Sequence, residues 1–193
     1  MDTSLSQKQQ SILIAAADLF LKYGIRKTGI RDIAQKANVS QVTIYNVFGK
    51  KNDLVATLVK KITQDVDDKY KAIMASEISF KEKVNKILQV KIEAHKKGAW
   101  QIVKEAMSLD PGLQESIYQN FKKNASDNIK EIITIGRKEG VISKKLSDDA
   151  IIMYMQAITL FFSKEDSGFE KYKNNPELVE ELYWIFWNGV MEK

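Results

Sequence analysis

Residues 28–54, with the sequence TGIRDIAQKANVSQVTIYNVFGKKNDL, decide the fold of this chain because they predict two short helices joined by a tight turn. Thr28 stands as the N-cap of the first helix, and Asp32 falls in its first turn, where the helix dipole favours an anion. After a two-residue turn, Ser40 caps the second helix, which runs from Gln41 to about Val47. Helices this short are unstable alone in water, so both must pack on neighbouring elements. The unit is a helix-turn-helix with one face available to a partner.

The second helix has an apolar side and a polar side. Spacing residues 41–48 at 100° intervals turns one set of side chains inward, namely Ile44, Val47 and Phe48, and turns another set outward, namely Val42, Thr43, Tyr45 and Asn46. Val42 matches a thymine methyl group, and Asn46 has the donor and acceptor that pair with the edge of adenine. Single exposed apolar residues are common, so Val42 taken alone is equally an ordinary surface residue. The outward face as a whole favours contact with DNA.

Positive charge is concentrated in the first 61 residues. They contain ten lysines and arginines and four acidic residues, which leaves +6, whereas the whole chain has 30 basic and 25 acidic residues and a net charge of +5. The remaining residues therefore carry −1. A basic region of this kind attracts a polyanion and releases counterions when it docks.

Composition bounds the rest of the protein. The chain has 193 residues, 44% of them apolar, which is enough for a sizeable core, and the few Pro and Gly residues mark no linker. The expected division is a DNA-binding domain at residues 1–50 and a larger helical domain at residues 51–193. With no cysteine, no apolar signal core near the start and no apolar run of ~18 residues, we expect a cytoplasmic, non-membrane protein without disulfides, metal or cofactor.

The fold class expected from periodicity is all-α. The first helix runs from about Gln7 to Tyr23, stops at Gly24, and carries an apolar stripe of Ile12, Ala16, Leu19, Phe20 and Tyr23. Further helices are expected over about 51–74, 79–97, 100–109, 112–139, 147–164 and 176–191, with Pro176 as a first-turn proline.

Residues 10–58 resemble the N-terminal domain of the TetR family of transcriptional regulators. The resemblance is carried by many positions at the family's spacing: Phe20, Gly24, Thr28, Ile33, Ala34, Ala37, Val39, Ser40, Thr43, Ile44, Tyr45, Phe48, Lys51 and Leu54. It implies a homodimeric, usually repressing regulator whose second domain binds a small effector. It also implies that Thr28, Tyr45 and Lys51 contact phosphates and that the segment Ser40–Asn46 enters the major groove.

Three positions depart from the family's pattern. Val42 stands where a Gly is common, Asn46 and Val47 stand where a second aromatic residue and a His are common, and Lys50 replaces a small polar cap. These changes bear on base preference, because they fall mainly on the outward face. Lys50 adds a candidate phosphate contact. The predicted DNA-binding residues are Thr28, Ser40, Gln41, Val42, Thr43, Tyr45, Asn46, Lys50 and Lys51.

The two C-terminal segments, at about 147–164 and 176–191, are apolar almost all round. A peripheral helix buries only one stripe, so these helices must be covered on two sides, which favours a homodimer with a four-helix interface. The alternative is a central position in a monomer core, and a membrane contact is disfavoured because neither segment has a strongly basic face. The predicted dimerisation residues are Ile152, Met155, Phe162, Tyr183, Trp184 and Trp187.

The middle helices contain aromatic and thioether side chains that suit an apolar effector pocket. The candidates are His95, Trp100, Met107, Tyr118, Phe121 and Met153. The same residue types also form ordinary cores, and the lone His95 makes neither a metal site nor a catalytic pair.

Taken together, the sequence predicts a ligand-responsive repressor that binds double-stranded DNA at a pseudo-palindromic operator as a dimer and is released by a largely apolar small molecule. One alternative is a sequence-indifferent architectural DNA-binding protein. A catalytic larger domain has little support, because the chain has no phosphate-binding glycine loop, no cysteine and no second histidine.

Overall fold

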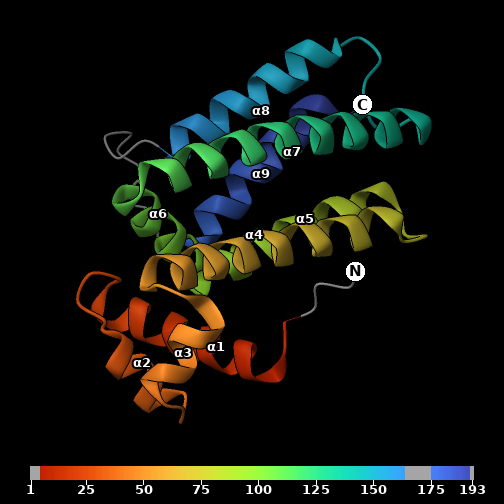
Figure 1. Cartoon of the computed structure of the whole chain (residues 1–193). Helices are drawn as coiled ribbons and strands as arrows, with labels where there is room; N and C mark the ends of the chain where they lie inside the picture. Colours follow the sequence, from red (N-terminus) through yellow and green to blue (C-terminus); the bar gives the residue numbers. More distant parts are fainter. Residues whose placement is uncertain (1–4, 164–174, 192–193) are drawn as a thin grey trace. The chain divides into compact units, whose positions relative to one another are not determined.

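The structure of the protein, a computed structural model, describes residues 5–163 and 175–191 (Figure 1). Its helices are α1 (Gln7–Tyr23), α2 (Ile30–Lys36), α3 (Gln41–Phe48), α4 (Lys51–Ala75), α5 (Phe80–Lys96), α6 (Ala99–Leu109), α7 (Pro111–Lys138), α8 (Asp148–Ser163) and α9 (Pro176–Val190). Within the described ranges the β-type pairing is an isolated antiparallel bridge between Ile142 and Met191. The all-α prediction is confirmed.

The chain forms two compact units. One consists of Met1–Ala72 and Glu93–Tyr118, and the other of Ile73–Ile92 and Gln119–Lys193. The first unit therefore includes most of α4 and all of α6 in addition to α1, α2 and α3. The division at residue 50 proposed from sequence stays a prediction.

Helix α1 begins and ends where its sequence predicts. The Ser6 hydroxyl accepts a hydrogen bond from the Gln9 N–H at 3.2 Å, while the Gln9 side chain accepts one from the Ser6 N–H at 2.8 Å, which makes a capping box. Gly24 ends the helix with φ of 84°, a conformation that favours glycine. Three residues of the predicted stripe are fully buried: Ile12, Ala16 and Phe20. Tyr23 is a correction, because it is the last residue of α1 and is exposed although its spacing places it within the stripe.

The N-cap of α2 also differs from the prediction. Gly29 rather than Thr28 precedes the helix, and the Asp32 carboxylate accepts the Gly29 N–H at 2.8 Å. Thr28 is only 2% exposed, and its hydroxyl donates to the carbonyl oxygen of Gly24 at 2.8 Å. The Thr28 hydroxyl is thus used to close the loop after α1, which leaves the capping to Asp32.

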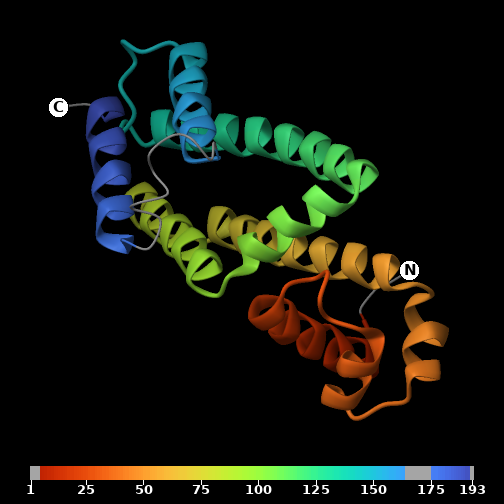
Figure 2. The same cartoon turned by 90° about the vertical axis from the view of Figure 1, so that its left-hand side faces the viewer.

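Helices α1, α2 and α3 lie together beside the first half of α4 in both Figure 1 and Figure 2. Their contacts form one apolar core with part of α6. Its buried members are Ile12, Leu13, Ala16, Phe20, Ile25, Ile30, Ile33, Ala34, Ile44, Phe48, Leu54, Val55, Leu58, Val59, Ile102, Val103 and Ala106. Burial of this apolar surface holds helices together that would be unstable alone.

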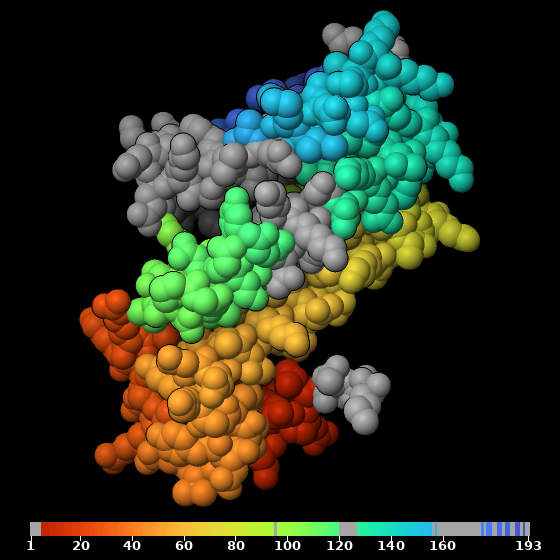
Figure 3. Space-filling view, turned by 45° about the horizontal axis from the view of Figure 1, so that its top comes forward, coloured from red at the N-terminus to blue at the C-terminus, as the bar shows by residue number. Residues whose placement is uncertain are grey.

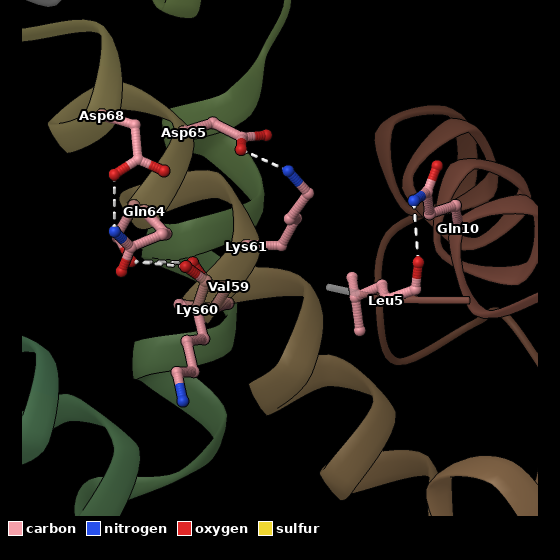
Figure 4. Close-up of polar contacts among 9 residues, drawn as sticks. Leu5, Gln10, Val59, Lys60, Lys61, Gln64, Asp65 and Asp68 are labelled. Carbon is pink, nitrogen blue, oxygen red and sulfur yellow. Dashed lines mark hydrogen bonds and ion pairs between the residues drawn. The ribbon is translucent and has the colours of Figure 1, made fainter. Parts of the chain in front are cut away.

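The middle of α4 carries polar pairs one helical turn apart (Figure 4). Lys61 forms an ion pair with Asp65, and the Gln64 amide donates to Asp68 at 2.8 Å. Such pairs stabilise a long helix by only a few tenths of a kcal/mol each, roughly 0.2–0.5. They also place an acid beside one of the lysines counted in the basic first third of the chain.

In the second unit, Lys83 of α5 forms hydrogen bonds with the C-terminal end of α4. Its side chain is buried, and its ammonium donates to the carbonyl oxygen of Met74 at 2.7 Å and to that of Ser76. These carbonyls lie at the C-terminal end of α4, where the helix leaves acceptors without an internal partner. Farther along, a Cβ on Gly136 would lie 2.7 Å from the side chain of Ile142, so glycine permits a close approach there.

Candidate nucleic-acid interface

The turn between α2 and α3 sets the direction of the recognition helix. Asn38 has a positive φ of 54°, which Asn tolerates better than most residues, and the Val39 N–H donates to the Ala34 carbonyl at 3.0 Å. Ser40 then caps α3, because its hydroxyl accepts the Thr43 N–H at 3.0 Å. The predicted turn and the predicted cap of α3 are both confirmed.

The inward face of α3 belongs to the core of the first unit. Ile44 is fully buried and Phe48 nearly so, while Val47 is half-buried against the same cluster. A helix of eight residues is thereby fixed by its apolar side, and its other side is left for contact with a partner.

The outward face of α3 has the composition predicted from its periodicity. Val42 is 65% exposed and Tyr45 is 51% exposed, and Gln41 and Asn46 are exposed beside them. Thr43 is half-buried, and its hydroxyl lies 2.9 Å from the hydroxyl of Ser40. The face thus presents one aliphatic group, two amides and a phenol. Their roles toward bases and phosphates stay predictions.

The first turn of α4 continues this surface. Lys50 is exposed, and its backbone N–H donates to the Asp53 carboxylate at 3.0 Å. Asp53 therefore makes the half of a capping box in which the third helical residue accepts the N–H of the residue before the helix. Figure 3 shows the residues drawn in orange, from the start of α2 into α4, as a continuous surface on the face in view.

Thr28 and Lys51, two residues with predicted phosphate contacts, form hydrogen bonds inside the protein. The hydroxyl of Thr28 is buried and donates to the Gly24 carbonyl oxygen, and the phosphate contact of Thr28 stays a prediction. The half-buried Lys51 donates to the carbonyl oxygen of Ile25 at 2.6 Å. Its ammonium has two further N–H donors, so a phosphate contact by Lys51 stays a prediction.

Lys51 is subject to two opposing electrostatic influences. Burial lowers the pKa of Lys51 below its ordinary value, while the negative charges of Glu105 and Asp32 oppose that shift. The cost of burial is the larger of the two.

Three exposed basic residues near α2 were not among the predicted DNA-binding residues, because helical periodicity does not select them. Arg26 and Lys27 lie in the loop between α1 and α2, and Arg31 lies in the first turn of α2. Two other basic residues counted in the first third, Lys36 and Lys61, form ion pairs, the former with Asp18 at 3.1 Å. These three residues were included in the charge count of the first 61 residues, but a charge count does not show where the charges lie on the folded protein.

The predicted effector residues are divided between the two units, and their role stays a prediction. Trp100 and Met107 of α6 are half-buried against the core of the first unit, whereas Tyr118 is exposed. Met153 of α8 is 69% exposed, so it lines no enclosed pocket of the second unit. The side chains of His95 and Phe121 lie outside the described residues.

The predicted dimerisation helices expose apolar side chains. Among the side chains of α8 and α9 that the structure describes, four large apolar ones are exposed, namely Met153, Tyr154, Trp184 and Ile185. Ile152 and Met155 are half-buried, and the side chains of three other predicted residues, Phe162, Tyr183 and Trp187, lie outside the described part of the chain. Exposed apolar groups of this size are typical of surfaces that bind another protein.

The described residues also bear on metal binding and on membrane insertion. Among the described residues, no cluster of His, Cys, Asp and Glu has the arrangement of a metal site. No described helix combines the length and the hydropathy that crossing a bilayer requires.

The capped α2–turn–α3 unit, buried on one side and polar on the other, has the arrangement of a helix-turn-helix, a unit that DNA-binding proteins place in the major groove. Residues 12–58 match the family described as "Bacterial regulatory proteins, tetR family". This match agrees with the resemblance found in the sequence and covers the helix-turn-helix part of the chain.

Relatives in sequence include two bacterial regulators. The chain is 31% identical over 94 residues to the HTH-type transcriptional repressor KstR2 of Rhodococcus jostii (strain RHA1), an alignment that spans 48% of this chain and 46% of that protein. It is 25% identical over 177 residues to the HTH-type transcriptional regulator YhgD of Bacillus subtilis (strain 168), spanning 90% and 89% of the two chains.

Similar solved structures support the fold of the whole chain. The fatty acid degradation regulator FadR from Bacillus halodurans has a TM-score of 0.73 at 18% identity and covers 97% of this chain and 98% of its own. The ketosteroid transcriptional regulator KstR2 of Mycobacterium tuberculosis has a TM-score of 0.60 at 18% identity, with 98% of each chain covered.

Proposed function

We propose that this chain is a transcriptional regulator of the TetR family, a cytoplasmic repressor that binds a pseudo-palindromic operator as a homodimer. The observation that carries the proposal is the outward face of α3, where Val42, Tyr45 and Asn46 are exposed on a helix fixed by Ser40 and by its buried side. A helix presented in this way fits the major groove, and side chains of these types read thymine methyl groups and adenine edges.

The dimer is supported by the apolar surface of α8 and α9. Trp184 is 67% exposed, and Met153 is exposed to a similar extent. Burying such groups against a second copy removes them from water and generates the two-fold axis that a pseudo-palindromic operator requires.

The proposed effector is a small, largely apolar molecule that favours the form of the dimer unable to bind DNA. An effector must bind one arrangement of the two recognition helices better than the other, because equal affinity for both would shift nothing. The names of two structural neighbours refer to fatty acid degradation and to ketosteroids, which makes fatty acids and steroids suitable first probes.

The function is tested by selecting bound fragments from a genomic DNA library with the purified protein and measuring affinity by fluorescence anisotropy. The expected result is a selected site with two-fold symmetry, bound by a dimer, and released by at least one member of a fatty acid and steroid panel. The same member should raise the Tm, because a ligand that binds the native state stabilises it. Binding without sequence preference would instead favour the architectural alternative.

A further inference from the structure

In the loop between α1 and α2, the backbone N–H and the backbone carbonyl oxygen of Ile25 both form hydrogen bonds with charged side chains. The Ile25 N–H donates to the Glu105 carboxylate of α6 at 2.8 Å, and the Ile25 carbonyl oxygen accepts a hydrogen bond from the Lys51 ammonium of α4 at 2.6 Å. Hydrogen bonds to ionised groups are about twice as strong as those between neutral groups. We name this arrangement of Glu105, Ile25 and Lys51 the loop clamp.

The surroundings of the loop clamp leave space for the carboxylate. A Cβ on Gly24 would lie 3.2 Å from the Glu105 Oε1, and Gly24 has a positive φ of 84°. Glycine at this position therefore both ends α1 and admits the side chain of α6. The side chain of Ile25 itself is buried in the core of the first unit, so the backbone of the loop is anchored on both sides.

Helix α6, which carries Glu105, is packed into the core of the first unit. Its residues Ile102, Val103 and Ala106 are buried in the same core as α1, α2 and α3. Gly98, before the helix, lies so close to Leu21 of α1 that a Cβ would come within 2.5 Å of its side chain. Glu105 thus projects from a helix whose position relative to α1 is fixed at two points.

The loop clamp connects the two segments that flank the DNA-facing surface. Directly after Ile25 come the exposed Arg26 and Lys27, followed by the start of α2, while Lys51 begins α4 directly after α3. Fixing both segments before DNA arrives lowers the entropy lost on binding. We propose that Glu105 is a positioning residue for DNA binding, which acts through the Ile25 peptide and rests on the DNA-binding function proposed above.

Charge alone predicts the opposite effect of removing Glu105. Deleting an acid from a protein that binds a polyanion should strengthen binding by simple electrostatics. If the clamp positions the loop, Glu105→Ala should instead weaken binding, on the order of 3- to 10-fold, which is less than the roughly tenfold or more that full loss of a charge-assisted hydrogen bond represents, because the bond acts on DNA only through the loop. Glu105→Gln removes the charge but keeps an oxygen that accepts the Ile25 N–H, so it should stay within about twofold of the parent.

The test uses the full-length dimer and the DNA site that the parent protein selects from a library. Affinity is measured by anisotropy over a salt series for the parent, Glu105→Ala, Glu105→Gln and the control Gln101→Ala, an exposed residue of the same helix. Amide hydrogen exchange at Ile25, followed by NMR, reports the clamp directly, and the Tm reports stability. We expect faster exchange at Ile25 and weaker binding only in Glu105→Ala, with an unchanged salt slope, because Glu105 contacts no phosphate.

Two results would overturn the proposal: parent-like affinity in Glu105→Ala despite faster exchange at Ile25, or equal losses in the Ala and Gln variants. Parent protein that shows a protected Ile25 amide but no preferred DNA site would instead place the failure in the proposed function, and the role of Glu105 in DNA binding would fall with it.

Discussion

The Ser40 hydroxyl accepts the Thr43 N–H at 3.0 Å and lies 2.9 Å from the Thr43 hydroxyl, so one side chain both starts α3 and orients a neighbour on its DNA-facing side. Loss of an N-cap typically costs about 1 kcal/mol. Ser40→Ala should therefore lower the free energy of unfolding by about that amount, measured by urea denaturation.

Replacing Ser40 by Asp separates capping from binding. Asp is as good an N-cap as Ser, so Ser40→Asp should retain near-parent stability. Its carboxylate would face phosphates at the start of the recognition helix, and DNA affinity should fall. Parent-like affinity in a stably folded Ser40→Asp variant would mean that the N-terminus of α3 does not approach DNA.

Asn46 should determine base preference at one position of each half-site. Asn46→Ala removes an exposed amide, so it should leave the Tm unchanged and reduce discrimination against substituted bases at that position by about 1–3 kcal/mol. Anisotropy against the selected site and its single-base variants measures this. Gln35→Ala, an exposed amide on α2, is the control. Unchanged discrimination at every position would contradict the assigned role.

Lys50 and Lys51 are neighbours with different expected effects. Exposed Lys50 is expected to contact phosphate only, so Lys50→Ala should weaken all DNA sequences alike and reduce the salt slope by about 0.9 without changing the Tm. Lys51→Ala also removes the hydrogen bond to Ile25, so it should lower both the affinity and the Tm. Identical behaviour of the two variants would argue against the internal role of Lys51.

A substitution at Trp184 tests the dimer interface proposed for α8 and α9. Its side chain is largely exposed in the single chain, so Trp184→Glu should place a charge in the proposed interface and convert a dimer, about twice 22.1 kDa, into a monomer. Light scattering coupled to gel filtration measures the mass. Glu181→Gln, at an exposed position of the same helix, should remain dimeric. A parent protein that is monomeric at micromolar concentration would refute the four-helix interface.

Lys83 should support the stability of the second unit. Lys83→Met removes the donor for the Met74 and Ser76 carbonyls, and leaving buried acceptors without partners costs about 1–3 kcal/mol each. The expected result is a lower unfolding free energy by chemical denaturation, with DNA contacts themselves intact. Lys86→Met, an exposed neighbour on α5, should unfold like the parent.

Local features of this fold were predictable from sequence, because local patterns determine them. The cap at Ser40, the stop at Gly24 and the buried side of α3 follow from residue type and helical spacing. The cap of α2 was misassigned because Thr28 and Gly29 are adjacent, and only the folded loop shows that the Thr28 hydroxyl is bound to Gly24.

Contacts between distant residues were not predictable. Glu105 reaches Ile25 across 80 positions of sequence, and nothing in the periodicity of α6 distinguishes this carboxylate from a solvated one. The internal bond of Lys51 was hidden for the same reason, since a basic residue at the start of a helix in a basic region indicates phosphate contact equally well. Exposure of Tyr23 depends on where the loop after α1 turns, which the stripe alone does not specify.

The most direct test of the account compares the affinity of the full-length protein for its selected site with its affinity for random DNA of equal length at the same moderate salt. A specific regulator should bind the selected site at least about 10³-fold more tightly, and the ratio should collapse in the double variant Val42→Ala, Asn46→Ala. A ratio near one for the parent protein would contradict readout of DNA sequence by the outward face of α3.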